Sequence, residues 1–350
     1  MTLIQRLPDA PLDIIGDIHG ELEALRALLW HLGYKDDGRH PKGRKIVFVG
    51  DLCDRGPYSY SVIKLAQRLI TGGHAQAILG NHELNLLTND IKDGSGWFFD
   101  ERLSQDQKYY APFERAPIQE RENIRSFLEK LPVILERDDI RVVHAAWTEA
   151  AANAVASASP VAVSEHYRRW DELARHAAGK TGLYAKYLEE KVNWANELED
   201  EHNPPPFLHA IAEYEATQQT INPLKVLTSG VETKASTAFF AGNRWRFSDR
   251  TTWWDDYEDK KPVVIGHYWR LYNPVQGQLV SRYSRLFSNI ESGSWHGKHR
   301  NVFCVDFSVG ARWRDRRAGR QADQSRFRLG ALQWPERRLV FDTGLHIPTY

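Results

Sequence analysis

Three short polar segments combine glycine with side chains that bind metals or transfer protons. They are Gly16-Asp17-Ile18-His19-Gly20, Gly50-Asp51-Leu52-Cys53-Asp54-Arg55-Gly56 and Gly80-Asn81-His82-Glu83. Hard or borderline dications such as Mn²⁺, Fe²⁺ and Zn²⁺ accept this mixture of carboxylate, amide and imidazole ligands. The segments therefore predict a divalent metal site that uses no thiolate.

Two further histidines follow apolar runs in the same manner. His144 comes after Arg141-Val142-Val143, and His267 comes after Val263-Val264-Ile265-Gly266. A metal ligand that directly follows a strand is carried by a rigid element and exposed on the loop beyond it. We therefore add both histidines to the candidate site.

The first 90 residues indicate βαβ units, because short apolar runs alternate with amphipathic helical patterns. Strands are expected over 12–15, 45–49 and 75–79, and helices over 22–32 and about 59–70. Each strand runs into one of the polar segments. Ligands bind at this edge of open α/β sheets, so the three segments should meet there.

The rest of the chain predicts further strands and a long helical stretch. Strands are expected over 141–144, 263–266, 302–307 and 339–341, and helical patterns dominate residues 150–225. We interpret the chain as a single catalytic domain over residues 1–350 that carries a helical insertion or cap at about 150–225.

Composition excludes several classes of protein. The 46 Lys and Arg balance 46 Asp and Glu, which argues against a general nucleic-acid binder. Two cysteines, Cys53 and Cys304, cannot form a disulfide framework and suit a reducing compartment. No apolar run approaches the roughly 20 residues of a membrane span, and residues 1–8 lack the apolar core of a signal peptide. We expect a cytoplasmic protein without a membrane partner.

The ordered motifs resemble those of the metallophosphoesterase (calcineurin-like phosphoesterase) superfamily. Within it they are most similar to the phosphoprotein phosphatase branch, which includes Ser/Thr protein phosphatases and diadenosine tetraphosphate hydrolases. The resemblance covers residues 16–267. It implies an α/β fold, a four-layer α/β/β/α sandwich of the metallophosphoesterase type with a helical insertion.

The resemblance also implies two divalent metal ions. Manganese is expected, with iron, zinc, nickel or cobalt as alternatives. By motif, the ligands of the first metal are Asp17 and His19, the bridging ligand is Asp51, and those of the second metal are Asn81, His144 and His267. Paired metals lower the pKa of bound water toward neutrality, so the expected nucleophile is a metal-bound hydroxide.

Three residues are expected to act on the substrate. Arg55 would bind phosphoryl oxygens through its planar guanidinium. The resemblance implies that His82 protonates the leaving oxygen and that Asp54 orients it, which suits an acid working near neutral pH. A second phosphate-binding arginine is sought in Arg246 or Arg250, although each could equally be an ordinary exposed arginine.

Two departures from the family pattern bear on the branch and the substrate. The run Gly266-His267-Tyr268-Trp269 lacks a second histidine, which fits the phosphoprotein phosphatase branch and argues against nucleases and phosphodiesterases. The His-Gly-Gly of that branch is replaced by His144-Ala145-Ala146. Because His144 itself is kept, this replacement affects the prediction of the substrate class more than the prediction of the metal site.

The sequence favours a phosphomonoesterase of the Ser/Thr protein phosphatase type, because Asp54-Arg55-Gly56 and Glu83 match that pattern. The substrate would be a phosphoprotein or a small phosphoester or nucleotide. Leu84-Asn85-Leu86-Leu87 instead suggests a dinucleoside polyphosphate hydrolase. A non-catalytic binding module is the alternative from another class, and the intact set of metal ligands argues against it.

Weaker features keep two interpretations each. The tryptophans of Trp253-Trp254 and Trp269 pack in the core or stack a nucleobase, and core packing is the default. The arginine-rich residues 312–328 form a solvated loop, or a hairpin tip that attracts anions. Cys53 is expected to be a small buried filler.

Overall fold

Two β-sheets carry the fold, which a computed structural model describes for residues 2–241, 243–272 and 282–350. The first sheet has the order β1 (Ile4–Arg6), β5 (Ile134–Arg137), β6 (Ile140–Val143), β9 (Val263–Ile265) and β10 (Val302–Cys304). The second has the order β14 (His346–Pro348), β13 (Arg338–Phe341), β12 (Arg328–Trp334), β2 (Leu12–Ile15), β3 (Lys45–Phe48) and β4 (Ala75–Ala77), and β11 (Asp306–Phe307) pairs with β12.

The two sheets pack face to face. Ile14 of β2 and Val47 of β3 lie in one buried cluster with Val142 of β6 and Val264 of β9. Neighbouring strand residues such as Ile15 point to the opposite face, because side chains alternate along a strand, and they belong to a second cluster. Each sheet thus has an inner and an outer apolar face.

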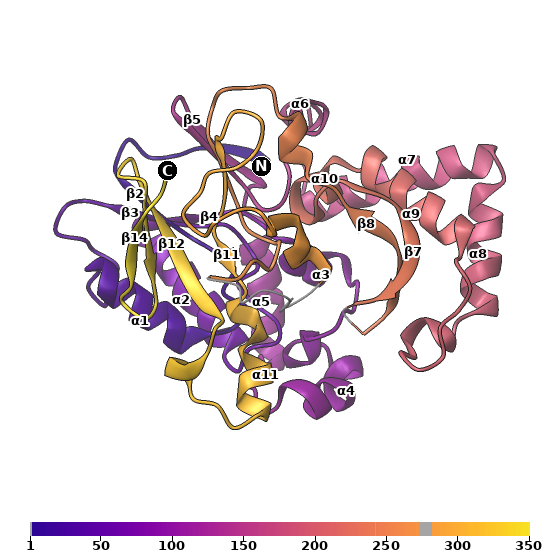
Figure 1. The fold of residues 1–350 in the computed structure, drawn as a ribbon, viewed down its shortest axis with the longest axis horizontal. Helices are drawn as coiled ribbons and strands as arrows, with labels where there is room; N and C mark the ends of the chain where they lie inside the picture. The colour runs from indigo at the N-terminus through magenta and orange to yellow at the C-terminus, as the bar shows by residue number, and fades with distance from the viewer. Residues whose placement is uncertain (1, 242, 273–281) are drawn as a thin grey trace.

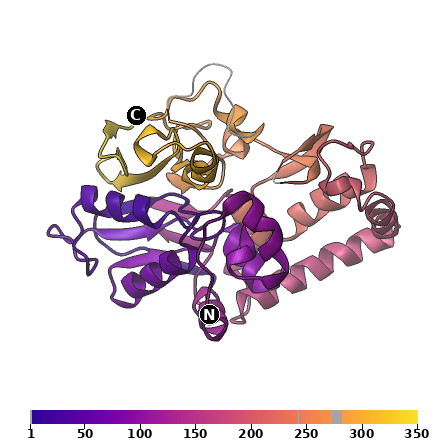
Figure 2. The ribbon, with the colours of Figure 1, turned by 90° about the horizontal axis from the view of Figure 1, so that it is seen from below.

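Helices cover the outer faces, as Figures 1 and 2 show. Helices α1 (Leu22–Leu32) and α2 (Ser59–Thr71) pack on the second sheet, and α6 (Glu149–Ala156) and α10 (Pro223–Ser229) lie over the first. The remaining helices near the sheets are α3 (Asn81–Thr88), α4 (Asp100–Tyr110) and α5 (Ile118–Leu128). The predicted four-layer α/β/β/α sandwich is confirmed.

The strands predicted to carry the polar segments are present. β2 pairs with β3 and β3 with β4, both in parallel, so their carboxyl ends meet at one edge. The predicted helix over 22–32 ends at Gly33, whose φ of 92° is the left-handed conformation of a helix C-cap. Local sequence signals were strong here because strand, turn and helix follow one another without long connections.

The single strand predicted over 302–307 is wrong. Its first part is β10, which pairs with β9, whereas β11 pairs with β12 in the other sheet. The chain passes between sheets at Asp306, whose carboxylate accepts the backbone N–H groups of Trp269 and Ser308. The strand β12 was not predicted, because it is buried on both faces and lacks alternation.

The helical region predicted at 150–225 contains α6, α7 (Val163–Lys180), α8 (Leu183–Asn193), α9 (His209–Ile221) and α10. A hairpin of β7 (Glu232–Phe240) and β8 (Trp245–Arg250), which was not predicted, packs on α9. Helices α8 and α9 and the hairpin stand to one side of the sheets (Figure 1) and share a small core that includes Ile211 and Phe247. Helices α6 and α10 instead belong to the larger core over the first sheet. The limits of the insertion stay a prediction.

The arginine-rich residues 312–328 connect β11 to β12, which pair in antiparallel, so they lie at the end of a hairpin, as one of the two interpretations expected. They begin with the short helix α11 (Arg312–Arg317). Arg312 is buried against Asp342, and Arg316 pairs with Glu21. Much of this positive charge is therefore neutralised within the fold.

Trp253 and Trp254 are buried, so core packing is confirmed for this pair. Among the described residues, no helix is both long enough and apolar enough to cross a bilayer.

A buried ion pair lies in the middle of the second sheet. The carboxylate of Asp13 in β2 is fully buried and accepts Arg44 Nε at 2.9 Å, Tyr34 OH at 2.7 Å and Gln333 Nε2 at 2.9 Å. Arg44 also donates to the carbonyl oxygen of Leu12. This network connects β2 to β12 and to the residue before β3, at the amino end of the strand that leads to the Gly16-Asp17 turn.

We expect Arg44→Met to lower the free energy of unfolding by about 3–5 kcal/mol, because it leaves the buried Asp13 carboxylate without its cation. Urea denaturation would measure the change. Arg39→Met is the matched control, since Arg39 pairs with Asp37 in an exposed position and its loss should leave the midpoint nearly unchanged. Equal losses in both variants would contradict this account of β2.

Candidate metal centre

The carboxyl ends of five strands bring the predicted ligands together. Asp17, Asp51 and Asn81 come after β2, β3 and β4, while His144 and His267 come after β6 and β9 of the other sheet. All of these elements end at the same edge of the sandwich. The site thus lies where the two sheets meet.

Asp51 is at the centre of the cluster. Its Oδ2 lies 3.3 Å from His144 Nε2, 3.7 Å from His19 Nε2 and 3.9 Å from His82 Nε2. The Nδ1 atoms of His19 and His144 lie at hydrogen-bond distance from the carbonyl oxygens of Cys53 and Val49, which holds the rings with Nε2 toward Asp51.

Two groups of residues could each hold a cation, and they share Asp51. In the first, ligand atoms of His19, Asp51 and His82 lie within 4.8 Å of one another. In the second, those of Asp51, His144 and His267 do so. A carboxylate common to both groups is what a bridging ligand requires.

Asp17 lies against His267. The backbone N–H of His267 is 3.1 Å and 3.0 Å from the two carboxylate oxygens of Asp17. His267 Nδ1 is in turn 3.2 Å from His144 Nε2. The structure therefore brings five of the predicted ligands into one buried cluster, Asp17, His19, Asp51, His144 and His267. Asp17, predicted as a ligand of the first metal, contacts His267 of the second group, and Asn81 follows Gly80, whose backbone lies against Asp51.

Two buried atoms of this cluster have no hydrogen-bond partner among the described residues. They are Asn81 Oδ1 and His267 Nε2. A buried polar atom without a partner costs about 1–3 kcal/mol, which a bound cation would offset. Together with the mixture of carboxylate, amide and imidazole donors, these atoms fit a pair of divalent metals.

The electrostatics of these side chains also favour a bound cation. Burial raises the pKa of the Asp17 carboxyl well above its usual value, and the nearby Asp306 carboxylate adds to the rise. Burial opposes the charge on His144, yet the Asp51 and Asp17 carboxylates raise the pKa of its imidazole to about 10. The buried carboxyl groups therefore favour a bound proton on Asp17 or His144. A bound cation would compensate the same negative charge.

His19 and His267 behave differently. Burial and the Arg55 guanidinium lower the pKa of His19 well below its usual value, and burial and Arg250 do the same for His267. Both imidazoles are therefore neutral near pH 7. Neutral imidazole is the form that binds metals.

The motif glycines allow the backbone to come close to the carboxylates. A Cβ at position 80 would lie 2.2 Å from Asp51 Oδ1, and a Cβ at position 266 would lie 2.0 Å from Asp17 Oδ1. His19, Asp51 and His267 also have positive φ values of 47°, 48° and 70°. Such conformations are costly for residues with a side chain and collect at functional sites.

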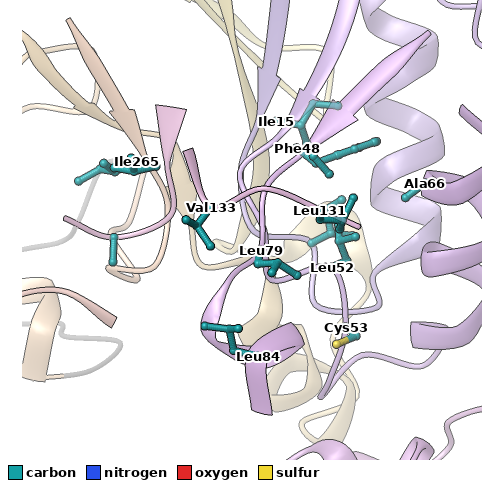
Figure 3. Close-up of a cluster of buried hydrophobic side chains, with 14 of the residues drawn as sticks. Ile15, Phe48, Leu52, Cys53, Ala66, Leu79, Leu84, Leu131, Val133 and Ile265 are labelled. Atoms are coloured by element: carbon teal, nitrogen blue, oxygen red, sulfur yellow. The ribbon is translucent and has the colours of Figure 1, made fainter. Parts of the chain in front are cut away.

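Glu83 supports these turns instead of reacting. Its carboxylate accepts the backbone N–H groups of Gly80, Asp51 and Leu52 at 2.9, 2.9 and 2.8 Å. It thereby connects the second motif to the third at the start of α3. Figure 3 shows Leu52, Cys53 and Leu79 among the buried side chains of this region.

His82 and Asp54 form a close pair. His82 Nδ1 lies 2.5 Å from Asp54 Oδ2, and Trp97 Nε1 donates to the other oxygen, Asp54 Oδ1, at 2.6 Å. The backbone N–H of Asp54 donates to Ser59 Oγ at 2.9 Å. A carboxylate fixed on both oxygens can hold the imidazole in one orientation, with Nε2 facing Asp51.

Arg55 lies at the edge of the same cluster. Its Nη1 is 3.1 Å from His19 Nε2, and its guanidinium lies over the Trp269 ring, 4.9 Å from the centroid. Trp269 thus contacts the cation of Arg55, a use of its ring that was not predicted.

The two arginines proposed as second phosphate-binding residues are placed differently. Arg250 Nη1 donates to the carbonyl oxygen of His267 at 3.5 Å, so Arg250 borders the cluster. Arg246 Nε donates to the carbonyl oxygen of Ala241, and its side chain contributes charge near Lys92. The structure brings Arg250, rather than Arg246, next to the candidate ligands.

Two residues of the site were missed. Asp306 lies close enough to Asp17 to raise its pKa and holds the backbone of Trp269 at 2.6 Å. Its position after the apolar run 302–305 is the same signal that identified Asp17 and Asp51. Trp97 carries no such signal, because it lies in a connection with no periodic pattern.

Curated relatives match part of the chain. A bis(5'-nucleosyl)-tetraphosphatase PrpE [asymmetrical] of Oceanobacillus iheyensis is 51% identical over 74 residues, which is 20% of this chain and 30% of that protein. Its counterpart from a Geobacillus species is 33% identical over 139 residues, 38% of this chain and 55% of that protein. The chain therefore matches from about a third to about half of the length of these relatives.

A solved structure, the cold-active protein-tyrosine phosphatase of a psychrophilic Shewanella, aligns over 100% of this chain and 83% of its own at 15% identity, with a TM-score of 0.46. The family model described as calcineurin-like phosphoesterase matches residues 10–210, more than half of the chain. The chain belongs to the calcineurin-like phosphoesterase family.

Proposed function

We propose that this protein hydrolyses phosphoester or phosphoanhydride bonds with two divalent cations, of which manganese is the first choice. The observation that carries the proposal is the convergence of three imidazoles on one buried carboxylate, Asp51, with unpartnered ligand atoms on Asn81 and His267 beside it. The proposed ligands are Asp17, His19, Asp51, Asn81, His144 and His267.

The cations would supply Lewis acidity, activation of water and charge neutralisation at the phosphoryl group. The protein's own groups do the rest. Arg55 offers parallel N–H donors to phosphoryl oxygens from its place beside His19. His82 gives a proton to the leaving oxygen, and Asp54 is the positioning residue that orients its ring at 2.5 Å.

For the substrate we propose a dinucleoside polyphosphate, which reverses the preference drawn from the sequence. The PrpE relatives, which are named as bis(5'-nucleosyl)-tetraphosphatases, support it, and so does the charge around the site. Arg250 borders His267, and burial together with the charges of Arg55 and Arg326 lowers the pKa of Arg314. Arginines on several sides of the cluster suit a chain of phosphates better than a single one. A phosphomonoester is the second candidate, favoured by the Asp54-Arg55-Gly56 motif.

Metal binding can be measured without activity. We expect the metal-free protein to bind about two equivalents of Mn²⁺ in isothermal titration calorimetry. Asp51→Asn should weaken this binding at least about 10-fold, because it removes the charge shared by both groups. Asp255→Asn, at an exposed aspartate, is the control and should bind like the wild type. Undiminished binding by Asp51→Asn would refute the assigned centre.

The proton donor is tested by His82→Asn, which should lower kcat on phenyl phosphate at least about 100-fold, because the basic leaving oxygen of this substrate needs a proton. His176→Asn changes an exposed histidine of α7 and should leave kcat unchanged. If His82→Asn retains full activity, the proposed role of His82 is wrong.

The substrate is tested by comparing kcat/KM on diadenosine tetraphosphate and on a phosphopeptide with the Mn²⁺-loaded protein. We expect faster turnover of the dinucleotide, with products separated by chromatography as ATP plus AMP or as two ADP. Phosphate release from the peptide alone would favour the second candidate. No turnover of either substrate, or of p-nitrophenyl phosphate, would favour a binding module without catalysis.

A further inference from the structure

The connection between α3 and α4 touches both Asp54 and Arg55. Trp97 Nε1 donates to Asp54 Oδ1, and the backbone N–H of Arg55 donates to the carbonyl oxygen of Gly94 at 3.2 Å. A Cβ on Gly94 would lie 2.8 Å from Arg55 Cγ, so this backbone lies directly against the Arg55 side chain. We call residues 93–97 the supporting segment.

Asp54 and Arg55 need such support. Their φ values are 73° and 68°, a conformation that non-glycine residues seldom adopt. Two successive residues in this region persist only where the surroundings hold them. The position of the Arg55 guanidinium therefore depends on contacts outside its own turn.

The supporting segment is itself fixed by α4. Asp106 accepts the backbone N–H of Gly96 at 2.7 Å, and Arg102 donates from Nε to Asp106 at 3.0 Å and from Nη2 to Asp93 at 3.2 Å. Tyr110 OH donates to the other oxygen of Asp93. Arg102 thus connects Asp93, at the start of the segment, to Asp106, the α4 residue that holds the backbone of Gly96.

The hairpin β7–β8 reaches the same carboxylate from a distant part of the chain. Asn243, in the turn of the hairpin, donates from Nδ2 to Asp93 Oδ1 at 2.8 Å across 150 residues of sequence. The hairpin packs on α9, within the helical part of the molecule seen at the right of Figure 1. This hydrogen bond connects that helical part to the supporting segment.

We propose that Asn243 is a positioning residue for Arg55, acting through Asp93 and the supporting segment. The proposal rests on the proposed function in that Arg55 is taken to bind the phosphoryl group. Asp93 already accepts hydrogen bonds from Arg102 and Tyr110, and the Asn243 amide supplies a further donor to Oδ1, the oxygen that also accepts from Arg102. Removing that donor weakens the hold on the Asp93 carboxylate. The backbone of Gly94, against which Arg55 packs, then becomes less rigid.

Asn243→Asp tests the proposal, because it keeps the size of the side chain but places a carboxylate against Asp93. We expect kcat/KM on the best phosphate substrate to fall about 10-fold, chiefly through KM. Asn243→Gly, which suits the positive φ of 54° at this position, should reproduce the loss. Thr237→Ala, at an exposed residue of the same hairpin, is the matched control and should behave like the wild type.

A double-mutant cycle separates positioning from general stability. If Asn243 acts through Arg55, Asn243→Asp should have almost no further effect on kcat/KM in an Arg55→Ala background. A loss in the double variant equal to the sum of the losses, in free energy, of the two single variants would overturn the proposal.

Hydrogen exchange followed by mass spectrometry gives a readout that needs no activity. In Asn243→Asp, the peptides that contain the amides of Arg55 and Gly96 should exchange faster than in Thr237→Ala, because both amides are bonded within the network. Unchanged exchange there would overturn the positioning role. A wild type that hydrolyses no phosphate substrate would refute the proposed function, and the exchange result would still decide the role of Asn243.

Discussion

The buried carboxylate of Asp51 sets the requirement that the rest of the site meets. It is 1% exposed and lies 3.3 to 3.9 Å from imidazoles on three separate segments. A buried charge costs several kcal/mol unless it is compensated. Burial opposes ionisation of Asp51, yet the surrounding histidines, His144 foremost, hold the pKa of its carboxyl well below the usual value. The apoprotein thus already surrounds an anion with groups that can also bind cations.

Placing these groups around one carboxylate strains the backbone, and the surrounding structure carries the strain. Positive φ values recur at His19, Asp51 and His267, where the turns leave their strands. Glu83 holds two of the motifs together through backbone N–H groups, and the apolar core behind them is continuous (Figure 3). Rigid strands and a packed core supply the stabilisation that offsets the cost of these conformations. Loops alone would not supply it.

The net charge of zero conceals an uneven distribution. Three arginines form ion pairs with acidic side chains, so their positive charges are neutralised within the fold. They are Arg312, Arg316 and Arg320. Arg55 and Arg250 instead border the cluster of candidate ligands, and Arg314 lies near enough to Arg55 for the two charges to interact. Attraction of an anionic substrate would therefore depend on local arginines and bound cations, not on the charge of the whole surface.

The sequence by itself determined β2, β3 and β4 and the glycine-flanked turns after them, and it predicted the candidate metal ligands, because each is a local pattern at a strand end. Only the tertiary structure decided that Arg250 rather than Arg246 borders the site, that the run 302–307 divides between two sheets and that Trp97 and Asn243 join the network around Asp54 and Arg55. Asn243 and Asp93 are 150 residues apart, and local periodicity carries no information about which distant side chain completes a hydrogen bond. Contacts of this kind arise only when the packing of sheets and helices brings separate segments together.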